Sequence, residues 1–138
     1  MNADAWTLLA ARSRAVVHHA SLLMGALTQP TQAGDDERAA VAARAADAVD
    51  ELLGPLAAAP ELAAHLRAVQ RFEASLAAWR RCLGAANPLE RRYQTALLQQ
   101  AAQVLTSCLH VETLANGECA RVEASAFDSP ARGSHGHA

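Results

Sequence analysis

Apolar residues recur at intervals of three and four between residues 62 and 83, which is the period of an α-helix with one buried face. The series is Leu62, Leu66, Val69, Phe72, Leu76, Trp79 and Leu83. We call such a row of apolar residues along one helix face a seam. Similar seams occur at residues 6–27 and 93–115, and a thinner, alanine-rich seam occurs at residues 41–53. The pattern therefore predicts four helical segments, and the short connections between them favour antiparallel neighbours.

Composition supports the same fold class. The chain of 138 residues contains 35 alanines, 18 leucines and no isoleucine, and only 4% of its residues are aromatic. Sandwiches and barrels need many β-branched and aromatic residues, which are scarce here. We predict an all-α fold, an up-down-up-down antiparallel four-helix bundle. The alternative is a helical dimer in which a spare apolar stripe of the first helix meets its symmetry mate.

Glycine, proline and capping residues set the expected helix boundaries. In chain order, the helices are expected from about Ala3 to Leu27, from Asp35 or Asp36 to Gly54–Pro55, from Pro60 to Gly84, and from Pro88, capped by Asn87, to a break at Asn116–Gly117 or a frayed end near Ala126. We expect residues 1–127 to form one domain and residues 128–138 to form a mobile tail.

Charge, cysteines and hydropathy limit the partners and the compartment. A formal net charge of −2 gives no overall attraction to nucleic acid or to a membrane. Three cysteines cannot form a paired disulfide framework, and the N-terminus lacks the features of a signal peptide. No apolar stretch approaches the roughly 18 residues that a membrane span needs. We therefore expect a cytoplasmic protein that binds neither nucleic acid nor membrane.

The sequence contains no recognisable catalytic arrangement. It has no nucleophile elbow, no glycine-rich phosphate loop and no dinucleotide fingerprint. Histidine phosphotransfer bundles carry a lysine three residues after the histidine, and this chain has no lysine. The expectation is that the protein is not an enzyme and holds no cofactor.

Two groups of residues have the chemistry of metal ligands. Cys108, Glu112 and Cys119 fall within about 40° on one helix face. His135 and His137 alternate in the tail and could chelate a transition metal loosely. A small metal- or cofactor-binding bundle is thus the alternative function. Burial of Cys108 as a small apolar residue is the simpler explanation, so we predict no metal site.

Charge is unevenly distributed along the chain. Residues 35–51 carry six acidic and two basic side chains, whereas residues 60–92 carry six arginines and three glutamates. Arg67, Arg71 and Arg81 lie within about 80° of one another, opposite the apolar seam of their helix. They form either a solvated face that pairs with the neighbouring acidic helix or a docking face for an acidic protein.

Two apolar stripes lie outside the expected core. The first consists of Leu8, Ala15 and Leu22, and the second of Leu98, Leu105 and Leu109. Because exposed apolar surface is usually buried by something, these stripes favour a non-enzymatic protein-interaction module. It would be an adaptor, an export chaperone or a regulator that binds a protein partner or itself, with a homodimer possible. In architecture the chain is similar to many small bacterial helical adaptors and secretion chaperones.

Overall fold

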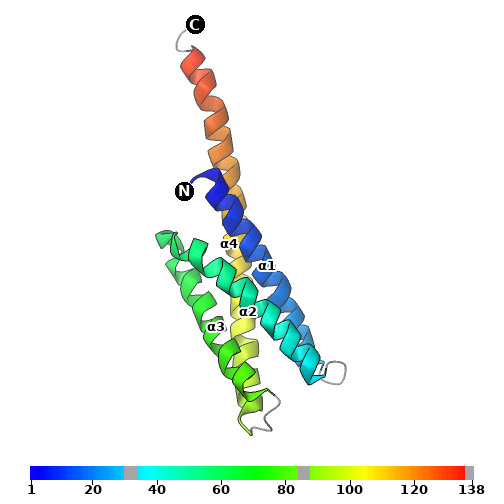
Figure 1. The fold of residues 1–138 in the computed structure, drawn as a ribbon. Helices are drawn as coiled ribbons and strands as arrows, with labels where there is room; N and C mark the ends of the chain where they lie inside the picture. The colour runs from blue at the N-terminus through cyan, green and yellow to red at the C-terminus, as the bar shows by residue number, and fades with distance from the viewer. Residues whose placement is uncertain (30–33, 84–87, 136–138) are drawn as a thin grey trace.

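The computed structural model describes residues 1–29, 34–83 and 88–135, with side chains up to residue 125. Its elements are α1 (Ala3–Thr28), α2 (Asp35–Ala57), the short 3-10 helix η1 (Pro60–Leu62), α3 (Ala63–Cys82) and α4 (Glu90–His135), as Figure 1 shows. The described part of the chain contains no strand. The predicted all-α fold is therefore confirmed.

Helix α1 follows its predicted seam. Asn2 caps it, because its side-chain oxygen accepts a hydrogen bond from the Ala5 amide at 2.8 Å. Its buried residues recur at intervals of three and four between residues 6 and 27: Trp6, Leu9, Ser13, Val16, Ala20, Leu23 and Leu27. The periodicity thus identified the buried face of this helix correctly.

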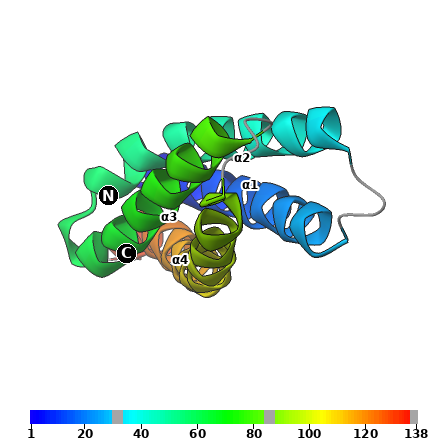
Figure 2. The same cartoon turned by 90° about the horizontal axis from the view of Figure 1, so that it is seen from below.

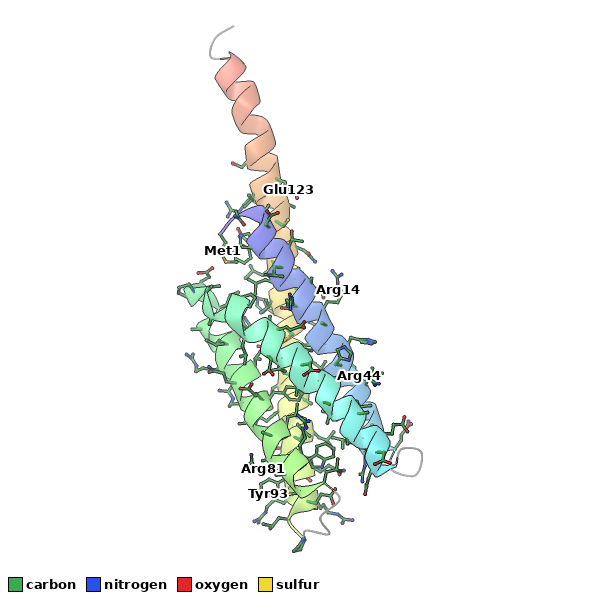
Figure 3. All side chains as sticks on the ribbon, in the orientation of Figure 1. Met1, Arg14, Arg44, Arg81, Tyr93 and Glu123 are labelled. Atoms are coloured by element: carbon green, nitrogen blue, oxygen red, sulfur yellow. The ribbon has the colours of Figure 1, made fainter. Side chains whose placement is uncertain are left out.

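Helix α1 packs most extensively on α4, and three polar contacts show which parts of the two helices lie side by side. Near the start of α1, Thr7 Oγ1 lies 3.2 Å from Cys119 Sγ, and Arg14 Nε lies 2.6 Å from Glu112 Oε2. Near the end of α1, the Leu27 carbonyl accepts a hydrogen bond from Gln94 Nε2. The first part of α1 therefore lies beside the last packed part of α4. In Figure 3, Met1 accordingly lies next to the stretch of α4 that carries Glu123.

Helices α2 and α3 complete the packing. Helix α2 packs on α1 and α3, and α3 also packs on α4, so each helix has two main neighbours (Figure 2). One core cluster joins all four helices, with Trp79 and Phe72 of α3 as its largest fully buried side chains. None of the described helices is long and apolar enough to cross a membrane.

The predicted end of the second helix at Gly54–Pro55 is wrong. Helix α2 continues to Ala57, with Pro55 inside its last turn, and the Ala58 amide bonds to the Gly54 carbonyl at 3.2 Å. A proline here removes one helical hydrogen bond. The continued helix brings Leu56 into the core with no exposed surface. Burial of a leucine contributes about 1.5–3 kcal/mol, which exceeds the net value of one hydrogen bond.

The predicted limits of the fourth helix also need correction. Helix α4 begins at Glu90, two residues after Pro88, and the predicted cap Asn87 lies outside the described residues. It does not break at Asn116–Gly117 but continues to His135, so the backbone of residues 128–135 is helical. That residues 128–138 form a mobile tail stays a prediction. Elongating an existing helix costs far less than nucleating one. Cys119 and Val122 also pack against the core beyond the glycine, which holds the helix across it.

Replacing Gly117 with alanine tests this continuity. A Cβ atom at Gly117 would meet no described atom within 4 Å, and the residue is exposed in the middle of a helix. Gly117→Ala is expected to stabilise the fold by about 0.5–1 kcal/mol, a rise in Tm of about 2–4 °C. Thermal unfolding followed by circular dichroism measures it. A glycine that ended the helix would adopt a left-handed conformation, and Gly117→Ala would then lower the Tm.

Candidate functional site

The predicted stripe on α1 is exposed at both ends. Leu8 and Leu22 expose 42% and 46% of their surface, while Ala15 between them is half-buried against the core. Leu22 lines a hollow of about 380 Å³ between α1 and α2, whose other walls come from Gly25, Ala26, Gln29, Glu37, Val41 and Arg44. Two of the lining residues, Gly25 and Ala26, are small, and a Cβ atom on Gly25 would meet no described atom within 4 Å.

The predicted stripe on α4 is only partly exposed. Leu109 exposes 49% of its surface, but Leu98 and Leu105 are half-buried and pack against the core. Glu112, one heptad after Leu105, pairs with Arg14 of α1, so this side of α4 faces α1. The stripe on α1 therefore borders the hollow between α1 and α2, whereas the stripe on α4 lies on the side of α4 that faces α1.

The predicted basic face is exposed. Arg67, Arg71 and Arg81 are all solvent-exposed, and none of them forms an ion pair with a described residue. Ion pairs do connect other helices, as Arg12 of α1 lies 2.8 Å from Glu51 of α2. Among the residues described, no ion pair joins α2 to α3, so the expected pairing between these two helices is not found.

Two carboxyl groups meet instead between α2 and α3. Glu73 is hydrogen-bonded to Asp50, and its pKa is raised by burial first, and then by the hydrogen bond to Asp50 and the charge of Asp50. The hydrogen bond requires a proton on one of the two groups. The charge of Asp50 opposes ionisation of Glu73, so the contact disfavours the charged form of Glu73.

The candidate metal ligands of the alternative function are not grouped into a site among the described residues. Cys108 is 1% exposed, and burial raises the pKa of its thiol to about 12, which disfavours the thiolate that binds metal. Glu112 is paired with Arg14, and Cys119 Sγ contacts Thr7. In the described ranges, no three His, Cys, Asp or Glu side chains are grouped to hold an ion. The side chains of His135 and His137 lie outside what the structure describes.

The structure brings together one polar cluster that the sequence analysis did not combine. His65 of α3 and His110 of α4 have ring centroids 4.9 Å apart, and Ser107 Oγ lies 2.6 Å from His65 Nδ1. The cluster borders an open hollow of about 450 Å³, which Ala102, Gln103 and Thr106 also line. Burial, and then the charge of His110, lower the pKa of His65. The sequence could have predicted this pair, because the two histidines lie a similar number of residues before and after the α3–α4 connection.

Comparison of the chain with protein-family models, curated proteins and solved structures finds no significant match. Any proposal for the function therefore rests on the arrangement of the side chains.

The Asp50–Glu73 pair predicts a pH-dependent effect of Glu73→Gln. A raised pKa in the folded state contributes stability below the unfolded pKa, and this contribution is lost as pH rises through the folded pKa. Glu73→Gln should therefore stabilise the protein at pH 7, by less than about 1 kcal/mol for a pair this exposed, and lose that advantage near pH 4. Tm measured at both pH values tests this. The control is Glu61→Gln, which removes an exposed carboxylate; an equal gain from both variants would exclude the pair as the cause.

The histidine pair predicts the opposite pH dependence. Because the pKa of His65 is lowered, its contribution to stability is present above the unfolded value of about 6.5 and is lost as pH falls below it. His110→Gln removes the repulsion but not the burial, so it should reduce the fall in Tm between pH 7.5 and pH 5 without abolishing it. His18→Gln, at an exposed position of α1, should leave that fall unchanged. The same slope in wild type and His110→Gln would show that the two rings do not interact.

Proposed function

We propose that the protein is a non-enzymatic protein-interaction module, built on an up-down-up-down antiparallel four-helix bundle, that binds one amphipathic helix of a partner protein along the outer edge of α1. The pairing of Thr7 with Cys119 at one end and of Leu27 with Gln94 at the other supports opposite directions for α1 and α4. An adaptor, an export chaperone or a regulator in the cytoplasm would use such a surface.

The observation that carries the proposal is the exposed Leu22 beside the hollow formed by Gly25 and Ala26. A glycine inside a helix costs about 0.5–1 kcal/mol relative to alanine, and no described residue lies within 4 Å of a Cβ atom placed on Gly25. Val41 of α2 supplies an apolar wall opposite Leu22. The hollow therefore offers room for an apolar side chain from outside, which is how a helix docks into a groove.

The rim of the hollow favours a protein helix over a lipid surface. Glu37 and Arg44 of α2 line it with opposite charges, and Gln29 adds an uncharged polar group. A mixed polar rim around an apolar centre is typical of protein interfaces. An anionic membrane would be attracted by a uniformly basic rim, which this hollow does not have.

The other predicted contacts extend the proposal. Leu109 on α4 and Leu8 on α1 are exposed single leucines that a longer partner helix or a second copy of the chain could cover. Leu98 and Leu105 contribute only their exposed parts. Arg67, Arg71 and Arg81 on α3 remain a predicted docking face for an acidic segment of a partner.

Substitutions in the hollow test the proposal. Leu22→Glu places a charge in the apolar contact, and Gly25→Leu fills the space from within the chain, where its Cβ meets no atom. Both should reduce capture of a specific protein by at least about tenfold, the loss expected for a central interface residue. The matched control is Ser21→Glu, which adds the same charge at the neighbouring exposed position.

The measurement is quantitative mass spectrometry of proteins captured from native lysate with each variant, together with sedimentation velocity over a range of concentrations. A protein retained by wild type and Ser21→Glu, but lost with both hollow variants, supports a partner helix. Concentration-dependent dimers that the same variants abolish would place a second copy in the hollow instead. Equal capture by all variants, or a strict monomer that captures nothing, would refute the docking site.

A further inference from the structure

The α3–α4 face carries a feature that protein docking on α1 does not use. His65 lies on the third helix and His110 on the fourth, with ring centroids 4.9 Å apart and ring planes inclined by 55°. His65 is half-buried and His110 is exposed, at the edge of the open hollow of about 450 Å³. Two imidazoles on different helices therefore face one another where solvent can reach them.

Ser107 gives the pair a defined orientation. Its hydroxyl lies 2.6 Å from His65 Nδ1, which is hydrogen-bond distance. When Nδ1–H donates to the hydroxyl oxygen, the neutral ring carries its lone pair on Nε2. A hydrogen bond to the second ring nitrogen is the arrangement that usually orients a metal-binding histidine.

We propose that His65 and His110 form a two-histidine site for a divalent transition ion of the Zn²⁺, Ni²⁺ or Cu²⁺ class, with Ser107 as a positioning residue. Neutral imidazole nitrogen suits these ions, whereas Mg²⁺ and Ca²⁺ prefer oxygen ligands. Among the described residues no third His, Cys, Asp or Glu side chain joins the pair. The ion therefore keeps coordination positions for water or for a group on a bound molecule, in the manner of an open site.

The physical state of His65 suits this role. Burial, and then the charge of His110, lower the pKa of His65, which favours the neutral ring that a metal ion binds. A bound ion would form two bonds that link α3 to α4.

The test is calorimetric titration of the full-length chain with Zn²⁺, Ni²⁺ and Mg²⁺ at pH 7.5. It uses a background carrying His135→Gln and His137→Gln, so that the C-terminal histidines cannot contribute. One Zn²⁺ or Ni²⁺ per chain should bind, and Mg²⁺ should not. His65→Gln or His110→Gln should each weaken binding by about a hundredfold or more, because two linked binding groups typically gain that much affinity over one group alone.

The matched control is His18→Gln. His18 and His19 also have ring centroids 4.9 Å apart, but they are consecutive residues of one helix. This variant should leave the affinity unchanged, and circular dichroism should show that every variant remains folded. If His65→Gln and His110→Gln bind the ion as tightly as the background protein, or if no saturable binding occurs at millimolar metal, the site does not exist.

Ser107→Ala tests the positioning role separately. Loss of the orienting hydrogen bond should weaken metal binding by about tenfold while both ligands remain. Nitrogen-15 NMR of the imidazole rings provides a readout that a purely structural role would not move. With Zn²⁺ bound, His65 should coordinate through Nε2 and keep its proton on Nδ1, and Ser107→Ala should allow both tautomers in the free protein. Coordination through Nδ1 would contradict this role for Ser107.

Discussion

The packing of α1 on α4 is the interaction on which the rest of the molecule depends. Leu9, Leu23 and Leu27 of α1 are almost completely buried, and Leu97 and Val104 of α4 are fully buried in the same cluster. Each buried leucine contributes about 1.5–3 kcal/mol, whereas the ion pair between Arg14 and Glu112 at the rim contributes less than about 1 kcal/mol. Apolar burial therefore holds the two helices together, and the polar contacts lie at the rim of this packing.

The other features of the molecule follow from the packing of α1 on α4. Because α4 covers one side of α1 and α2 the next, the outer edge of α1 with Leu8 and Leu22 remains exposed. The first half of α2 contributes only alanines, Ala42 and Ala45, to the buried core, so it covers α1 thinly and leaves the hollow beside Gly25. Helix α3 also packs on α4, and His65 meets His110 in that contact.

The sequence predicted the buried faces of the helices well, because each has a regular apolar period and burial decides packing. It failed where a local signal opposed burial. Gly54–Pro55 and Asn116–Gly117 favour helix ends, but Leu56 beyond the first pair and Cys119 beyond the second pack into the bundle. Leu98 and Leu105 were placed outside the core because a single helix pattern does not show how far a neighbouring helix reaches.

The candidate sites depended on information that no single helix contains. Exposure of Leu8 and Leu22 followed from their position opposite the seam of α1. The hollow needed the position of Val41 on α2, and the histidine pair needed the register of α3 against α4. Charge composition predicted attraction between α2 and α3, yet the contact that forms brings Asp50 to Glu73. Individual contacts are set by register, which net charge does not determine.

Native-state hydrogen exchange of the free protein is the most direct test of the claim that the rest of the molecule depends on the packing of α1 on α4. Amides near the buried residues of α1 and α4 should exchange slowest, by global unfolding. Amides in the first half of α2 should exchange through smaller openings. Figure 1 shows these segments in blue, yellow and cyan. If α1 exchanged before α2, or if all helices exchanged at one rate, the claim that the rest of the molecule depends on the packing of α1 on α4 would be wrong.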